Sequence, residues 1–271
     1  MILAFPDGRE LGSIIATPME KSPRRCINWK SIGIYYMIAC LWSWPFFWRR
    51  DVLHIPETSL PIHWALMWGP GLAALVCMAV FWRSHRRSIT LFGDSWSRSI
   101  FFYVAPFLIL TLFRAHPLNG YARRPLIAAL PMLVSNFGEE LGWRGFLQDA
   151  LRSLPPLKRF SLIGVLWESW HFTTHLHGRI LLVLVLFYSL AILLSFAIGY
   201  AAEYSHSIVV AVSLHAYVDL LLQNPELYVP LLIALPVFAF LLLTWPKQQS
   251  RSELESVAVA PSQTPPSNES R

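Results

Sequence analysis

Residues 138–145 read Gly-Glu-Glu-Leu-Gly-Trp-Arg-Gly, two adjacent carboxylates and an arginine at the end of a long apolar run. On membrane-insertion scales, an acidic or basic residue at the centre of a helix costs about 2.5–3.5 kcal/mol. Three such residues within about one turn of a membrane segment therefore need a compensating role. We interpret them as catalytic.

The composition is that of a membrane protein. Of the 271 residues, 55% are hydrophobic and 14% are charged, whereas a soluble domain has about a quarter charged residues. The three cysteines, Cys26, Cys40 and Cys77, have neither paired nor CxxC spacing, so the sequence predicts neither a disulfide framework nor a zinc ribbon. The formal net charge of +6 fits loop arginines that face anionic lipid, and we expect no nucleic-acid partner.

Long apolar runs predict the architecture. At a rise of 1.5 Å per residue, most of them can cross a hydrocarbon core of roughly 30 Å. We therefore expect an all-α fold, a polytopic membrane bundle of about eight transmembrane helices. The runs are at residues 31–48, 62–82, 99–115, 125–142, 160–176, 180–202, 207–223 and 228–245.

The distribution of positive charge predicts the orientation. Sixteen of the 22 lysines and arginines fall in one set of alternate connections, so the positive-inside rule places both termini in the cytoplasm. We expect a cytoplasmic N-terminal segment (1–27), a membrane domain (28–246) and a disordered cytoplasmic tail (247–271). The loop with Arg123 and Arg124 is also basic, so a re-entrant or partial helix near 114–125 is an alternative.

Ionisable residues lie within three of the predicted helices. Spacings of three or four residues place Glu168 with His171, and His215 with Asp219, on shared helix faces. By the predicted orientation and helical rise, Glu139, His171 and His215 reach the same depth, in the cytoplasmic half of the bilayer. These side chains are therefore expected to form one cluster.

The residue types of this cluster suit amide hydrolysis. A carboxylate among apolar residues can take a proton from water and pass it to a leaving amine. Two imidazoles can orient that water, bind a metal or donate hydrogen bonds to an oxyanion. No Ser-His-Asp arrangement is evident and no cysteine lies near the cluster, which favours direct attack by water over an acyl-enzyme intermediate.

Three motifs occur in order within apolar helices. Residues 139–144 fit the pattern EExxxR, residues 167–171 resemble FxxxH with Trp167 in place of Phe, and residues 215–219 fit HxxxN/D. In this order and spacing the chain resembles the CAAX-prenyl protease and bacteriocin-processing family of intramembrane proteases, also called CPBP or Abi. The motif core of this protease domain covers about residues 125–222.

The resemblance implies an eight-helix membrane endopeptidase that acts on a prenylated or other membrane-associated peptide or protein. It implies that Glu139 is the catalytic base, aided by His171. His215 and Asp219 complete the site, either as metal ligand and support or as an oxyanion hole. A zinc ion would be held by His171 and His215 with Glu139, and a metal-independent glutamate mechanism is the alternative. The HExxH pattern of soluble zinc proteases is absent.

Four further residues are expected to support the site. Glu140 and Arg144, four residues apart, are interpreted as an internal ion pair that holds the helix. Trp167 keeps an aromatic side chain at its motif position, and Glu168 matches no motif position and is expected at the rim of the site.

Other functions fit less of the sequence. Glu168 and His171 have the ExxH spacing of di-iron sites, but the further histidine boxes of membrane desaturases are missing. An inactive family member could serve as a membrane scaffold, chaperone or immunity protein, although it would be expected to lose Glu139 or a histidine. A transporter fits the composition alone. We expect a bacterial plasma membrane location, with the endoplasmic reticulum as the alternative; the sequence leaves the substrate and the oligomeric state open.

Overall fold

A computed structural model describes residues 26–53, 60–81, 87–112, 125–175, 181–223, 238–239 and 242–244. Within these ranges the regular elements are helices, apart from one isolated β-bridge between Thr90 and Ser207. The predicted all-α class is confirmed. The elements are α2 (Trp29–Leu53), α3 (Leu60–Met67), α4 (Gly69–Val80), α5 (Trp96–Leu112), α6 (Pro125–Gly142), η1 (Trp143–Leu147), α7 (Gln148–Ala150), α8 (Pro156–His175), α9 (Leu181–Ser205) and α10 (Ile208–Gln223).

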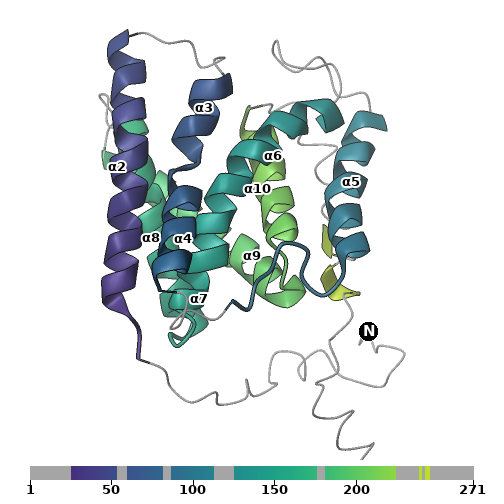
Figure 1. Ribbon diagram of the computed structural model, residues 1–271. Coiled ribbons are helices and arrows are strands. Elements are labelled where there is room, and N and C mark those ends of the chain that lie inside the picture. Colours follow the sequence, from purple (N-terminus) through teal and green to yellow (C-terminus); the bar gives the residue numbers. More distant parts are fainter. Residues whose placement is uncertain are drawn as a thin grey trace, which may run out of the picture.

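Helix α6 lies at the centre of the bundle (Figure 1). It packs against α3, α4, α5 and α10, while α8 packs against α2 and α9. Helix α8 also contacts η1, the segment that continues α6. The three motif-bearing segments, far apart in the sequence, are therefore neighbours in the fold.

The end of α6 is not an ordinary α-helix. After Gly142 the chain continues through the π-helical segment η1, in which the backbone N–H of Gln148 donates to the carbonyl of Trp143. All five residues of η1 are buried, and Arg144 is one of them. The hydropathy of the sequence does not predict this segment. Single π turns inside helices are frequent at functional sites, and this one directly follows the paired glutamates.

The second apolar run, residues 62–82, forms two helices instead of the single predicted one. The break is at Trp68, and Pro70 lies in the first turn of α4, where its missing N–H is not needed. A Cβ atom on Gly138 would lie 2.8 Å from Cγ of Trp68, and one on Gly142 would lie 2.5 Å from Cβ of Pro70. These two glycines let α6 approach the broken helix closely, as small residues at this spacing commonly do in membrane bundles.

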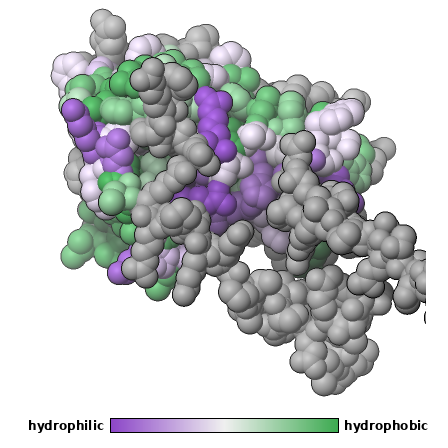
Figure 2. Space-filling view, turned by 60° about the horizontal axis from the view of Figure 1, so that its bottom comes forward, coloured by the Kyte–Doolittle hydropathy of each residue, from purple (hydrophilic) through white to green (hydrophobic). Residues whose placement is uncertain are grey.

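One helix of the described residues, α9, is long and apolar enough to cross a membrane. Its mean hydropathy is 2.8, and only 17% of its most apolar window is buried inside the protein. Large apolar side chains project outward from it, including Leu181, Leu182, Val185, Leu186 and Leu193. Figure 2 shows hydrophilic residues grouped at the end of the bundle that is lowest in Figure 1, with hydrophobic residues along the sides.

The number of membrane crossings stays a prediction. Helix α9 alone meets the length and hydropathy criteria within the described ranges, so eight crossings are not confirmed. Most of the eighth run, 228–245, lies outside these ranges, as do nearly all of the predicted N-terminal segment and the tail. The uncertain connection at 114–124 also lies outside them.

Candidate active site

A cavity of about 270 Å³ lies among α6, α8, α9 and α10. All four side chains predicted to be catalytic, Glu139, His171, His215 and Asp219, line it, and so does Glu168. The remaining walls are mainly apolar, with Met67, Met132, Trp167, Phe187, Leu190, Ala191, Leu194, Val218 and Leu222. The fold thus gathers the predicted cluster around one space that also accepts apolar groups.

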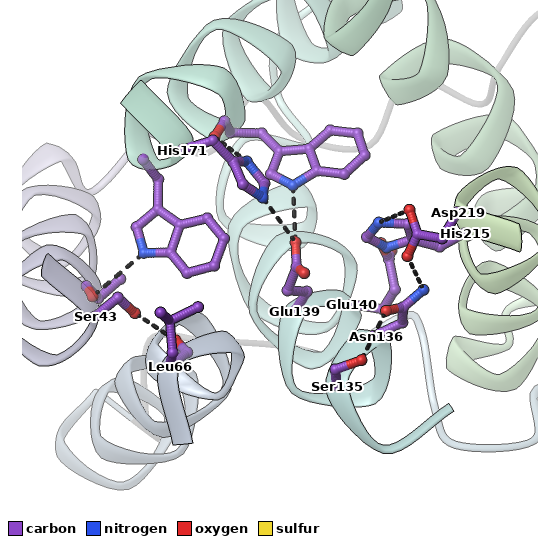
Figure 3. Close-up of polar contacts among 12 residues, drawn as sticks. Ser43, Leu66, Ser135, Asn136, Glu139, Glu140, His171, His215 and Asp219 are labelled. Carbon is purple, nitrogen blue, oxygen red and sulfur yellow. Dashed lines mark hydrogen bonds and ion pairs between the residues drawn. The ribbon is translucent and has the colours of Figure 1, made fainter. Parts of the chain in front are cut away.

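Glu139 faces the cavity from α6 and is 3% exposed. Its Oε2 accepts a hydrogen bond of 2.9 Å from the indole Nε1 of Trp167. The same oxygen lies 4.0 Å from Nε2 of His171 (Figure 3). This distance is too long for a direct hydrogen bond. It leaves the carboxylate and the imidazole side by side at the cavity, at a separation that one water molecule could bridge.

The orientation of His171 is set by its own helix. Its Nδ1 lies 3.0 Å from the backbone carbonyl of Trp167, one turn earlier in α8. A carbonyl oxygen can only accept, so Nδ1 carries the hydrogen and the neutral ring has its lone pair on Nε2. The ring also packs edge-on against Trp170, with centroids 4.5 Å apart. His171 therefore presents a basic nitrogen toward Glu139.

Glu140 connects two of the motifs. Its Oε1 accepts from Nη1 of Arg144 and also lies 2.8 Å from Nδ1 of His215. Both members of the Glu140–Arg144 ion pair are fully buried. Because the carboxylate accepts from both neighbours, Nδ1 of His215 is the protonated nitrogen and Nε2 faces the cavity side of the ring. The pair expected to hold its helix also orients His215, a contact that the sequence spacing does not predict.

Trp167 contacts residues of the other two motifs. Besides donating to Glu139, its ring lies 5.0 Å below the guanidinium carbon of Arg144 and 5.0 Å from the ring of His215 at an angle of 87°. Phenylalanine at this position could make the ring contacts but has no N–H to donate. The departure from the FxxxH pattern therefore adds a hydrogen bond to the predicted base.

Sequence reasoning missed two polar residues of the cavity, Ser135 and Asn136, and Asn136 is the one bonded to a predicted site residue. Its Nδ2 donates a 2.8 Å hydrogen bond to Oδ2 of Asp219, while Oδ1 of Asp219 lies 3.8 Å from Nε2 of His215. Asn136 is 2% exposed and lines the cavity. The available signal was its position, three residues before Glu139 and so on the same helix face.

The predicted metal ligands do not fit a metal ion in this arrangement. Within the ranges described, no three His, Cys, Asp or Glu side chains are grouped as ligands. Nδ1 of His215 is held by Glu140, and Nε2 of the same ring lies beside Asp219. We therefore derive no chemical step through a metal, and zinc stays a prediction.

A family comparison covers this part of the chain. Residues 122–221 match the family described as type II CAAX prenyl endopeptidase Rce1-like. The matched segment contains all three motifs and the helices that surround the cavity, from α6 through most of α10. No curated protein and no solved structure matches the chain significantly.

Proposed function

We propose, from the match of residues 122–221 to the Rce1-like family of type II CAAX prenyl endopeptidases, that the protein is an intramembrane endopeptidase that uses Glu139 to activate water. The match agrees with the resemblance drawn from the three motifs. The chemistry at the residues, the substrate and the location are our proposal. The observation that carries it is the pairing of Glu139 with His171 at the wall of a cavity that also has apolar walls.

The proposed reaction begins with a water molecule between Oε2 of Glu139 and Nε2 of His171. Glu139 takes a proton from this water as its oxygen attacks the peptide carbonyl, and His171 accepts the second hydrogen of the water as a hydrogen bond. The tetrahedral intermediate then collapses, and Glu139 passes its proton to the leaving amine. His215 is held by Glu140, and its ring would stabilise the oxyanion in the form in which Nε2 also carries a hydrogen.

The apolar walls support a substrate that is itself apolar. A membrane-associated or prenylated peptide would place its hydrophobic part against the side chains of α9, among them Phe187, Leu190 and Leu194. Lipid surrounds the bundle in this proposal, and the bacterial plasma membrane with cytoplasmic termini remains the proposed setting. An inactive scaffold or immunity protein is the competing proposal, and activity decides between them.

Replacement of Glu139 tests the function directly. Purified protein in lipid nanodiscs should cleave a quenched fluorescent peptide that ends in a prenylated CaaX sequence. Glu139→Gln keeps the size of the side chain and its contact with Trp167 but removes the base, so we expect cleavage to fall by at least about 1,000-fold. Comparison of peptides released in cells that carry the wild type or this variant would identify natural substrates.

Glu203→Gln is the matched control, because Glu203 is a carboxylate of α9 that pairs with Arg159 outside the cavity. Its cleavage rate should equal that of the wild type. Undiminished cleavage by Glu139→Gln would refute the mechanism, whereas a folded wild type that cleaves neither the probe nor any cellular peptide would favour the scaffold. Metal analysis with chelation of the same preparation separates the zinc and glutamate-only mechanisms.

A further inference from the structure

The proposed hydrolysis needs hydrogen-bond donors at the cavity, because the attacked carbonyl oxygen becomes an anion. The inference below rests on that proposed function. It concerns which side chains of this chain can supply the donors. The polar side chains that line the cavity are Ser135, Asn136, Glu139, Trp167, Glu168, His171, His215 and Asp219.

Several of these side chains have no hydrogen to give to an oxyanion. Ionised carboxylates only accept. The single N–H of Trp167 is directed at Glu139. His171 uses its Nδ1 hydrogen on the carbonyl of Trp167, so Nε2 of the neutral ring is an acceptor. The hydroxyl of Ser135 is within 3.1 Å of two oxygens, the carbonyl of Met132 and the side chain of its neighbour in the sequence.

Asn136 does have a donor left. Its orientation is fixed from both ends, since Oδ1 faces the hydroxyl of Ser135 at 3.1 Å and Nδ2 donates to Asp219 at 2.8 Å. A primary amide carries two N–H groups on one nitrogen, and the bond to Asp219 uses one. The other stays on a buried side chain that lines the cavity, on the α6 face that also carries Glu139.

We propose that Asn136 is a catalytic residue whose second amide N–H donates to the oxyanion. This proposal gives Asp219 an orienting role. As a carboxylate it cannot donate, but it holds the amide of Asn136 from one oxygen and lies 3.8 Å from Nε2 of His215 with the other. Asp219 therefore orients the amide of Asn136, while Glu140 holds His215. The donor amide comes from α6 and the orienting carboxylate from α10.

The test is the cleavage of the prenylated CaaX probe by variants of Asn136 in nanodiscs, with kcat and KM measured separately. An oxyanion exists only after attack, so its donor affects kcat and not KM. Asn136→Ala should lower kcat by about 100- to 1,000-fold, the range for loss of one oxyanion donor, with KM within about threefold of the wild type. Unchanged kcat, or a change confined to KM, would overturn the proposal.

A reciprocal exchange distinguishes catalysis from folding. Asn136→Asp alone should be as slow as Asn136→Ala, because two carboxylates then face each other. Combining it with Asp219→Asn restores one amide and one carboxylate, with the donor moved to α10. We expect this double variant to recover kcat by at least about tenfold over Asn136→Asp. A double variant that folds but remains as slow as Asn136→Asp would contradict the proposal. This result can be obtained even if Asn136→Ala does not fold.

Ser213→Ala is the control for a buried polar loss elsewhere in the bundle. Ser213 lies on α10, is fully buried and donates to the carbonyl of Phe102 outside the cavity. Its variant should lose some thermal stability and keep the wild-type kcat. Failure of the proposed function appears differently, as a wild type that does not cleave or a Glu139→Gln variant that does.

Discussion

Two arginine–glutamate pairs are buried in the described bundle, and they differ in what surrounds them. Arg144 pairs with Glu140 at the site at 2.8 Å, and Arg159 at the start of α8 pairs with Glu203 of α9 at 2.7 Å. Each guanidinium also lies over an aromatic ring, at 5.0 Å for Arg144 and 4.8 Å for Arg159. The pairs are alike in chemistry, so their differences come from the fold.

In the Arg159 pair, Nε of the guanidinium has no hydrogen-bond partner among the described residues, while both terminal nitrogens are bonded. Its Nη1 donates to the carbonyls of Arg152 and Leu154, so the guanidinium also ties down the turn before α8. Glu203 is 24% exposed, which leaves part of its carboxylate accessible to solvent or headgroups. If one partner is removed, Arg159 still has its backbone carbonyls and Glu203 still has its solvent-accessible surface.

The Arg144 pair has neither backbone acceptors for its guanidinium nor solvent access among the described residues. Both side chains are fully buried, and among the described residues Oε2 of Glu140 and Nε and Nη2 of Arg144 have no hydrogen-bond partner. Oε1 of Glu140 is shared with His215. The site pair thus has more unpartnered polar atoms than the Arg159 pair, and its carboxylate also holds a histidine from another helix.

Arg144→Met should have the largest effect on stability. It leaves the buried charge of Glu140 without its cation, and loss of one partner of a buried pair costs about 3–5 kcal/mol. We expect poor folding, and no cleavage by any folded fraction because His215 loses its fixed partner. Thermal unfolding in detergent micelles measures the first effect. A variant as stable as the wild type would show that the pair contributes no net stability.

Arg159→Met should have an intermediate effect. We expect a loss of about 1–3 kcal/mol in unfolding free energy, because the carbonyls of the turn lose a charged donor while Glu203 stays partly solvated. The folded protein should keep its wild-type kcat, since Arg159 lies outside the cavity. If kcat fell in proportion to the loss of stability in both arginine variants, the Arg144 pair would have no specific effect on catalysis that the Arg159 pair lacks.

Trp167→Phe should have the smallest effect on stability, about 1 kcal/mol, because Phe retains most of the ring surface below Arg144. It removes the N–H donated to Glu139, and loss of a typical hydrogen bond costs about 0.5–1.5 kcal/mol. We expect kcat to fall by about tenfold. Trp143→Phe is the matched control, because the indole N–H of Trp143 has no partner within the described residues.

Several features of the site follow from spacing along the chain. His215 and Asp219 are four residues apart, and Glu140 and Arg144 are as well, so helical geometry alone brings each pair together. The order of the three motifs then indicates the family, which the comparison confirms. The run Gly69-Pro70-Gly71 was also a usable sign of the break between α3 and α4, since proline and glycine interrupt helices.

Other features have no counterpart in local pattern. The sequence around a single asparagine in an apolar helix does not indicate which residue it bonds. Asn136 donates to Asp219, which is 83 positions later in the chain. The π-helical turn of η1 follows the paired glutamates with no proline or hydropathy change to mark it. The indole bond from Trp167 to Glu139 requires a particular rotation of α8 that hydropathy does not specify.

The sequence by itself determined the helical class, the motif residues that line the cavity and the pairs within one helix, because each depends on residue type and on a helical period of 3.6. Only the tertiary structure decided which helices face one another. It brings three pairs from different helices into hydrogen-bond contact: Glu140 with His215, Asn136 with Asp219, and Trp167 with Glu139. These contacts depend on helix rotation and on close approach at Gly138 and Gly142, and such packing is a property of several segments at once.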